Sequence, residues 1–455
     1  MQNRMRLIGC LAALPLLLTA CFGGTANNAS DAGGGSGTGQ VTYWLWDANQ
    51  LPAYQACADA FHTANPKITV KITQLGWDDY WSKLTAGLVS GTAPDVFTDH
   101  VSKYPEYALK GQLAPLDDYI KKDNTSTDIY QPGLADLWVG QDQKRYGLPK
   151  DWDTVALFYN KKMAAAGGLS NQQMSSLTWN PSDGGTYEKA IAHLTVDKNG
   201  KRGDEPGFDK QSVKIYGLGY PGSGSWFGQT EWSMYVLSTG WQYTNKNPWG
   251  DQYNYSDPKF VDMITWFRSL ISKGYAPPYS VVSSGVSMID AFNAGKYALT
   301  MNGDWTIGDY TKAKNIQLGL APTPTGPDGQ RASVFNGLAD SITANSKNKD
   351  AAWQWVKFLG SAACQDSVAS KAVVFPAIPA ATDKAEVAFK ARRGVDVSAF
   401  TVQVKDKTTH LAPITDHSAD IDKIMAPTME SILLFKTEPG PALNKATDQI
   451  NALFK

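Results

Sequence analysis

The chain has 455 residues, of which 42% are apolar and 19% are charged, and its formal net charge at pH 7 is −1. This composition is that of a globular protein, and the length exceeds what one hydrophobic core usually organises, so two lobes are expected. The near-neutral charge argues against a nucleic-acid-binding surface, which needs a basic stripe.

The N-terminal segment has the pattern of a lipoprotein leader. Arg4 and Arg6 precede an apolar run, Leu7 to Ala20, that is too short to span a bilayer as a helix. The run ends in Leu-Thr-Ala-Cys at Cys21, which resembles the lipobox at which bacterial lipoproteins are cleaved and acylated. We predict that residues 1–20 are a signal peptide and that Cys21 carries the lipid, with a plain secretory signal as the alternative.

Residues 21–40 are rich in Asn, Ser and Gly and show no apolar pattern. Such a composition is typical of a flexible tether. Folding is expected to begin at Val41, so the tether would connect the folded part to the membrane.

Four cysteines are present, of which one lies in the predicted signal peptide and one is the predicted lipidation site. Cys10 leaves with the signal peptide and Cys21 carries the lipid, so Cys57 and Cys364 remain in the folded part. Outside the cytoplasm such a pair can be oxidised, but two separate buried thiols are equally consistent with the count.

With 15 tryptophans and 20 tyrosines, the chain is rich in aromatic side chains. A buried indole needs a partner for its N–H group, so a core does not require this many. Aromatic faces also hold the C–H faces of sugar rings in water. A single Trp is best interpreted as core, whereas the set as a whole favours a carbohydrate-binding surface.

The first folded stretch alternates strands and helices. An apolar strand at 41–46 is followed by a helical pattern over 51–64 and by period-two alternation over 68–72. A second helix begins at Asp78, and a short strand follows at 95–97. This order predicts a parallel sheet in an α/β lobe.

In open parallel sheets, ligands bind beyond the carboxyl ends of the strands. Here these ends carry aromatic rings and carboxylates, which cover the apolar face of a sugar and accept hydrogen bonds from its hydroxyl groups. The residues concerned are Trp46, Asp47, Trp77, Asp78, Asp99 and His100. For Asp78 we favour helix capping over ligand contact.

A further acidic and aromatic cluster precedes the apolar run 155–159. It consists of Asp151, Trp152 and Asp153 at the mouth of a predicted strand. Glycosidases pair carboxylates, so the two acids are the best enzymatic candidates. At positions i and i+2 of a strand, however, they can point the same way and are too close to bracket a glycosidic bond well.

Two other motifs match known sites only in part. Asp197–Glu205 begins like a calcium loop, but Lys201 occupies the fifth position and position twelve has no glutamate, so we predict a hairpin turn. Gly217–Gly222 spells the dinucleotide fingerprint without opening a periodic helix. The 5 histidines are scattered without cysteine partners at zinc spacing, so we predict no metal and no cofactor.

The rest of the chain continues with strands and helices. We predict that the segment 226–232, which contains Trp226 and Gln229, lines a surface or cleft, and that a strand over 298–301 ends in a glycine turn with an exposed Trp305. Further expected elements are a helix from Asp257, a Pro/Gly linker at 321–329, a strand at 331–342, a helix at 352–359 shortly before Cys364, and a terminal helix at 443–450.

The order of several short motifs resembles the family 1 extracellular solute-binding proteins, which are the carbohydrate-binding lipoproteins of ABC importers and are related to maltose-binding protein. The resemblance covers residues 41–455. The matching motifs are the lipobox at Cys21, Phe61-x3-Asn65-Pro66-x-Ile68-x-Val70, Gly91-x2-Pro94-Asp95-Val96, Tyr146-Gly147-Leu148-Pro149, Phe158-Tyr159-Asn160-Lys161, Gly295-Lys296-x-Ala298-Leu299, Asn302-Gly303-x-Trp305 and Ser346-Lys347-Asn348-Lys349-x-Ala351-Ala352-Trp353.

This resemblance implies an α/β, two-lobe periplasmic-binding-protein type II fold in which crossing hinge strands join the lobes. Lobe 1 and lobe 2 would comprise, respectively, residues 41–115 plus 331–375 and residues 116–330 plus 376–455. Cys57 and Cys364 would then both fall in lobe 1, which favours a disulfide between them.

A sugar site between the lobes is also implied. With the strand-end residues, the candidate ligand-binding set is Trp46, Asp47, Trp77, Asp99, His100, Asp151, Asp153, Trp226, Gln229, Trp305, Asn336 and Gly337. Trp305 would serve as a stacking platform. The long region 170–255 departs from the maltose-binding relatives, which leaves the size and identity of the sugar open.

The function that follows is that of a receptor held by lipid on the extracytoplasmic face of the bacterial cell membrane. As a monomer it would bind a mono- or oligosaccharide and deliver it to the permease subunits of an ABC importer. Two alternatives remain: a secreted carbohydrate-active enzyme that uses Asp151 or Asp153, and a binding protein for another solute, such as a peptide or a polyamine.

Overall fold

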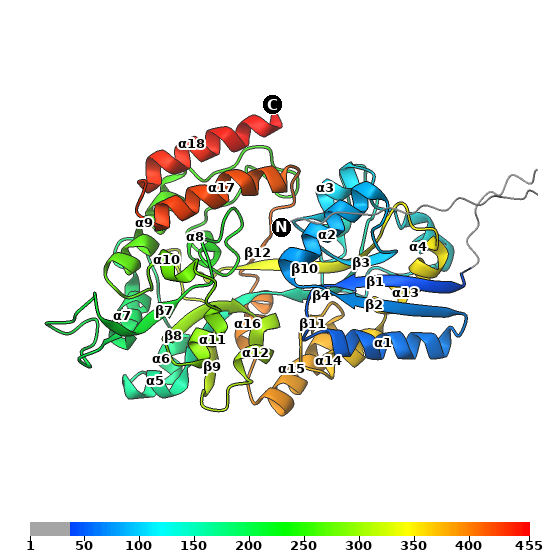
Figure 1. The fold of residues 1–455 in the computed structure, drawn as a ribbon. Helices are drawn as coiled ribbons and strands as arrows, with labels where there is room; N and C mark the ends of the chain where they lie inside the picture. Colours follow the sequence, from blue (N-terminus) through cyan, green and yellow to red (C-terminus); the bar gives the residue numbers. More distant parts are fainter. Residues whose placement is uncertain (1–36) are drawn as a thin grey trace, which may run out of the picture. The chain divides into compact units, whose positions relative to one another are not determined.

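The computed structural model describes residues 37–455 (Figure 1). The predicted signal peptide, the predicted lipidation site Cys21 and most of the predicted tether lie outside these residues. Strand β1 (Gly39–Leu45) begins two residues before the predicted start of folding at Val41. Over the described range, no helix combines the length and the apolar character needed to cross a bilayer.

A seven-stranded sheet contains the strand-helix-strand-helix-strand order expected for the N-terminal part. β1 pairs in parallel with β2 (Ile68–Gln74) and with β3 (Val96–His100), and helices α1 (Leu51–Ala64) and α2 (Trp77–Ser90) connect them. The strand order is β11-β4-β10-β3-β1-β2, with β12 on β10. The other strands of this sheet are β4 (Leu148–Asp153), β10 (Ser333–Ile342), β11 (Phe375–Pro376) and β12 (Thr409–Leu411). The predicted parallel arrangement of the first three strands is confirmed.

The packing of α1 follows from its apolar spacing. Tyr54, Cys57, Ala58 and Phe61 recur every three or four residues and are buried against the first sheet and its helices. On the other side, Trp355 of α13 (Lys349–Leu359) packs edge-on against Phe61, with ring centroids 5.3 Å apart. One apolar face thus holds α1 to a helix almost 300 positions away in the chain.

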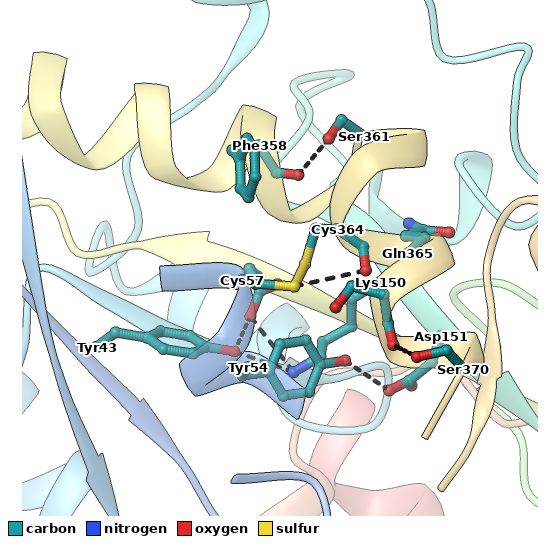
Figure 2. The surroundings of a disulfide bond; sticks show 12 residues. Tyr43, Tyr54, Cys57, Lys150, Asp151, Phe358, Ser361, Cys364, Gln365 and Ser370 are labelled. Atoms are coloured by element: carbon teal, nitrogen blue, oxygen red, sulfur yellow. Dashed lines mark hydrogen bonds and ion pairs between the residues drawn. A yellow bond between two sulfur atoms is a disulfide. The ribbon is translucent and has the colours of Figure 1, made fainter. Parts of the chain in front are cut away.

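Cys57 on α1 and Cys364 on α14 (Ala362–Ala369) form a disulfide bond, with their Cα atoms 5.2 Å apart. Figure 2 shows this bond beside the rings of Tyr43 and Tyr54 and the side chain of Lys150. The cysteine count alone was equally consistent with a disulfide and with two free thiols. The disulfide, which the family resemblance favoured, is the one present.

A second sheet of five strands has the order β6-β7-β8-β5-β9. Its strands are β5 (Val155–Asn160), β6 (Val196–Asp197), β7 (Val213–Gly219), β8 (Tyr297–Gly303) and β9 (Leu318–Ala321). β4 ends at Asp153 and β5 begins at Val155, so Thr154 alone connects the two sheets at this crossing. Two sheets, each with its own helices, constitute the expected two-lobe α/β fold.

The remaining helices comprise a C-terminal pair and the helices that connect the strands. α17 (Ser418–Leu433) and α18 (Pro439–Asn451) run side by side (Figure 1). The others are α3 (Tyr104–Leu109), α4 (Asp117–Asp123), η1 (Asp136–Trp138), α5 (Lys161–Ala166), α6 (Asn171–Ser175), α7 (Gly185–Leu194), α8 (Ser233–Leu237), α9 (Pro258–Ser272), α10 (Tyr279–Val282), α11 (Met288–Asn293), η2 (Asp304–Thr306), α12 (Ile307–Tyr310), α15 (Pro379–Arg393), α16 (Ser398–Lys405) and η3 (Ala452–Phe454).

The chain stays beside the first sheet well beyond residue 115, where the sequence-based boundary was set. Tyr119 of α4 stacks on Trp353 of α13, with ring centroids 5.5 Å apart. β4 pairs with β10 within the first sheet. Both α4 and β4 therefore lie with the elements predicted for lobe 1, although their residue numbers fall in the range predicted for lobe 2.

Candidate ligand-binding site

A cavity of about 400 Å³ lies where the strand-end loops of the first sheet meet segments that follow strands of the second. It is lined by Trp46, Asp47, Ala48, Asn49, Gln50, Gln74, Trp77, His100, Asp151, Trp152, Asp153, Gln229, Trp305, Asp309, Asn336, Leu338 and Val374. Nine predicted residues are among these: Trp46, Asp47, Trp77, His100, Asp151, Asp153, Gln229, Trp305 and Asn336.

The loop after β1 is shaped by Asp47. One carboxylate oxygen of Asp47 accepts a hydrogen bond of 2.8 Å from the backbone N–H of Asn49, and the other accepts one of 3.0 Å from Nε2 of Gln50. These bonds form the turn that leads into α1, and they hold Asn49 and Gln50 against the cavity. Burial raises the pKa of the Asp47 carboxyl above its usual value.

Aromatic rings build one wall of the cavity. The Trp46 ring meets the rings of Trp77 and Trp81 with centroids 5.2 and 5.4 Å away. Trp77 is 47% exposed, so its indole is available at the mouth of the cavity. His100 extends the wall, 5.9 Å from Trp77 between ring centroids. Such a surface fits the apolar face of a ring-shaped ligand.

The floor of the cavity is acidic and hydrogen-bonded. Asp151 and Asp153 project from β4, and Nε2 of Gln229 donates a 2.6 Å hydrogen bond to Oδ1 of Asp153. The side-chain amide of Asn336 on β10 lies 3.0 Å from Oδ2 of Asp153 and 2.9 Å from Nε2 of His100. Three segments distant in sequence are thus joined at Asp153.

Burial shifts the pKa values of the titratable groups at the cavity toward their neutral forms. Burial raises the pKa of Asp151 to about 7, with Lys150 opposing the rise and the nearby carboxylates adding to it. Burial first, and then the neighbouring Asp151, raise the pKa of Asp153 as well. Burial lowers the pKa of His100 to about 3, so its imidazole is neutral at physiological pH.

Trp305 reaches the cavity from the second sheet. It follows the turn after β8, and its indole folds back over Gly303, where an added Cβ would lie only 1.7 Å from the ring. Glycine is therefore required at 303 for this position of the ring. The partly buried Trp305 packs against the apolar cluster of the first sheet that contains Val41 and Leu45.

Three predicted residues are not among the lining residues. Asp99 and Gly337 each neighbour a lining residue on a strand, and alternate strand residues point to opposite faces. Asp99 is fully buried, and an added Cβ at Gly337 would lie 2.7 Å from the side chain of Leu134. Trp226 is 4% exposed and packs against Phe227 in the core, with ring centroids 5.7 Å apart.

Several residues that line the cavity were not in the predicted ligand-binding set: Ala48, Asn49, Gln50, Gln74, Trp152, Asp309, Leu338 and Val374. Asn49 and Gln50 adjoin Asp47, so the same strand-end rule extended by one turn would have found them. Asp309 lies one helical turn after Trp305. Val374 has no sequence signal that distinguishes it from any core valine.

Most tryptophans serve the core, so the carbohydrate-surface interpretation of the whole set was wrong. Those that are buried outside the cavity are Trp81, Trp138, Trp179, Trp226, Trp232, Trp241, Trp266, Trp353 and Trp355. Trp46, Trp77, Trp152 and Trp305 are the ones that line the cavity. The interpretation of a single tryptophan as core therefore holds for most of them but not for the four that line the cavity.

The calcium-like segment is a turn. The carboxylate of Asp197 accepts hydrogen bonds from the backbone N–H groups of Asn199, Lys201 and Asp209, at 2.8, 2.9 and 2.9 Å. These bonds occupy the oxygens that a cation would need. Between residues 37 and 455 no group of three or more His, Cys, Asp or Glu side chains is placed to hold a metal ion.

A cleft whose walls come from two α/β lobes, with rings on one side and carboxylates on the floor, defines a solute-binding protein. Comparison with known families agrees. Residues 56–393 match the family model of the bacterial extracellular solute-binding proteins, and the chain belongs to this family.

Individual relatives are distant but span the chain. The galactooligosaccharide-binding protein of Bacillus subtilis is 23% identical over 98% of this chain and 96% of its own. Among solved structures, UspC of M. tuberculosis is 26% identical, with a TM-score of 0.70 over 91% of this chain and 99% of its own. The GacH receptor of Streptomyces glaucescens, also solved with acarbose, is 23% identical with a TM-score of 0.73, over 92% and 98%.

Proposed function

We propose that this chain is a lipid-anchored extracytoplasmic receptor that binds a mono- or oligosaccharide in the cleft and delivers it to an ABC import permease. The observation that carries the proposal is the convergence of Trp46, Trp77 and Trp305 on one cavity with Asp151 and Asp153. Rings cover the apolar faces of a sugar, and carboxylates accept hydrogen bonds from its hydroxyl groups.

The dimensions and the relatives support a sugar. A cavity of about 400 Å³ falls in the range of about 300–1,000 Å³ that small-molecule sites occupy. The B. subtilis relative is named for galactooligosaccharides, and the S. glaucescens receptor was solved with acarbose. An extracellular family also agrees with an extracytoplasmic location.

Binding would close the lobes around the ligand. We place one hinge at Thr154, because β4 belongs to the first sheet and β5 to the second. This assignment moves α4 and β4 from the predicted lobe 2 to lobe 1. A sugar that contacts both lobes favours the closed state by its differential affinity, and the permease would recognise that state.

The lipid anchor rests on the sequence alone. The lipobox ending at Cys21 supports it, together with the tether between Cys21 and β1. Mass spectrometry of the chain purified from bacterial membranes would test it, because a mature N-terminus at Cys21 with a diacylglyceryl mass is expected. An unmodified N-terminus would contradict the anchor without affecting the sugar site.

An enzymatic role has less support. Asp151 and Asp153 lie two positions apart on one strand and both line one cavity floor, whereas glycosidases place their two carboxyl groups on either side of the bond that is cleaved. The matched relatives with assigned names are binding proteins.

A thermal-shift screen of the purified chain tests the proposed ligand class. The lipidated chain is kept in a detergent that has no sugar headgroup, because such a headgroup would compete with the saccharides for the binding site. A ligand that binds only the folded state raises the melting temperature by mass action. At least one mono- or oligosaccharide is expected to do so, whereas silence across the saccharide panel with a response to peptides or polyamines would contradict the proposal.

A further inference from the structure

The charges around the cavity are unbalanced. Four aspartates line it, and neither lysine nor arginine is found among the lining residues of the described chain. At the rim, Asp309 is ion-paired with Lys312 at 2.6 Å. Asp47, Asp151 and Asp153 form no ion pair with any side chain between residues 37 and 455. The cavity therefore holds three carboxyl groups that have no ion-pair partner in the described chain.

The nearest buried cation is used elsewhere. Lys150 donates hydrogen bonds of 3.0 Å to the Tyr43 hydroxyl and 2.9 Å to Thr98, and its Nζ lies 3.8 Å from Asp340. Its Nζ also lies over the ring of Tyr54, 3.7 Å from the centroid, as Figure 2 allows the reader to follow. Lys150 is thus ion-paired with the buried Asp340 and does not line the cavity.

Polar acceptors are also left without donors on this floor. Asn336 is 2% exposed, and although its amide approaches Asp153 and His100, its Oδ1 atom has no hydrogen-bond partner in the described chain. Within residues 37–455, the Asp151 carboxyl accepts a single side-chain hydrogen bond, a long one of 3.5 Å from the Tyr54 hydroxyl. A buried acceptor without a donor is costly, so this floor is complementary to a ligand that is rich in donors.

We infer that the sugar bound here carries a protonated amine, so that the ligand is an amino sugar whose ammonium group lies between Asp151, Asp153 and Asn336. This inference rests on the proposed function. An ammonium group supplies three N–H donors and one positive charge, whereas a hydroxyl group supplies one donor and no charge. Trp46 and Trp77 add faces that attract a cation as well as a sugar ring.

The cavity also favours a saccharide over a simple polyamine. Besides Asn336, four amide side chains line it, and each both donates and accepts hydrogen bonds, which is what sugar hydroxyl groups require. They are Asn49, Gln50, Gln74 and Gln229. A linear polyamine has no hydroxyl groups to satisfy them.

Binding of an amine has a protonic signature that a neutral sugar lacks. Burial raises the pKa of Asp151 to about 7, so part of the population holds a proton on this carboxyl at neutral pH, and burial raises the pKa of the neighbouring Asp153 as well. The groups that face them are Asp47, Asp304, Asp340, Lys150, Tyr54 and the neutral His100. An ammonium group lowers both pKa values, so protons are released into the buffer.

The test is calorimetry at pH 6.5 with a matched trio of disaccharides of one linkage: one with free amines, its N-acetylated form, and its hydroxyl counterpart. Several linkages are screened. For the linkage that binds, the free amine is expected to bind at least tenfold more tightly than both partners. Its apparent enthalpy should change between buffers of different ionisation enthalpy in the direction of proton release.

Two variants separate the charge from the fold. Asp153→Asn should reduce the preference for the amine to less than threefold, whereas Asp420→Asn, which removes a carboxylate that pairs with Lys423 on α17 outside the cavity, should keep it. If Asp153→Asn does not fold, Asp151→Asn takes its place, and proton release by the unaltered chain remains decisive.

Equal affinity for the amine and hydroxyl sugars without proton release would overturn the inference and leave the proposed function standing. Tighter binding of spermidine than of any saccharide, or no saccharide binding at all, would overturn both.

Discussion

Asn49 and Asp309 are 260 positions apart in the chain, yet Nδ2 of Asn49 donates a 3.0 Å hydrogen bond to the Asp309 carboxylate. Asn49 follows a strand of the first sheet, and Asp309 lies on α12 after a strand of the second. Lys312 completes the contact, because its Nζ lies 3.3 Å from Oδ1 of Asn49. The lobes are thus joined by side chains at the rim of the cavity.

Asn49→Ala should weaken sugar binding about fivefold, because one hydrogen bond that favours closure, of about 1 kcal/mol, is lost. Titration calorimetry measures the affinity. Asn315→Ala is the matched control, because Asn315 is an exposed asparagine that follows α12, the helix of Asp309, and does not line the cavity. Equal affinities of the two variants would show that the rim contact does not contribute to closure.

Trp77→Ala should weaken binding by about five- to thirtyfold, since a stacked ring contributes about 1–2 kcal/mol. Its indole is 47% exposed, so the melting temperature should change little. Val89→Ala on the same helix, where the side chain is 77% exposed, controls for a general effect on α2. Unchanged affinity in Trp77→Ala would remove this ring from the site.

The double variant Cys57→Ala/Cys364→Ala should lower the free energy of unfolding by about 2–5 kcal/mol, because the bond closes a loop of 307 positions. Denaturant unfolding measures the change. Reducing agent should destabilise the unaltered chain and leave the variant unaffected. If the reductant has no effect on the unaltered chain, the two thiols are not bonded in solution.

Asp99→Asn should make stability less dependent on pH. Burial raises the pKa of Asp99 to about 8 from an ordinary value of 3.8. Between these values the folded state holds a proton that the unfolded state has lost, so the contribution of Asp99 to stability falls as pH rises. An amide avoids this loss.

Urea unfolding at two pH values provides the measurement. Asp99→Asn should match the unaltered chain at pH 4 and exceed its stability by about 1–3 kcal/mol at pH 8. A variant that is less stable at pH 8 would show that the ionised carboxylate is stabilised in the fold.

Local patterns in the sequence were sufficient to predict many of the helices and strands and much of the cavity lining. Helical spacing predicted α1 and α2, and the rule that ligands lie beyond parallel strand ends placed Trp46, Trp77 and His100 together. The order of the family motifs supplied Trp305 and Asn336. Both belong to segments that only the tertiary fold brings to the first sheet.

The position of two predicted residues outside the cavity lining has a physical explanation. Asp99 and Gly337 come from strands on which the lining residue is the neighbour, and the sequence alone did not tell which face each residue occupies. The contact between Asn49 and Asp309 has no local pattern at all. Lobe membership depends on the pairing of β4 with β10 and on the stacking of Tyr119 of α4 on Trp353, and hydrophobic periodicity encodes neither contact.

The central claim is that a saccharide is held between the two lobes. It is tested most directly by titrating the purified chain and its Trp305→Ala variant with the saccharide that gives the largest thermal shift. We predict one binding site per chain, with affinity at least tenfold weaker in the variant and the circular dichroism spectrum unchanged. Equal affinity in a folded Trp305→Ala variant, or no heat from any saccharide, would contradict the claim.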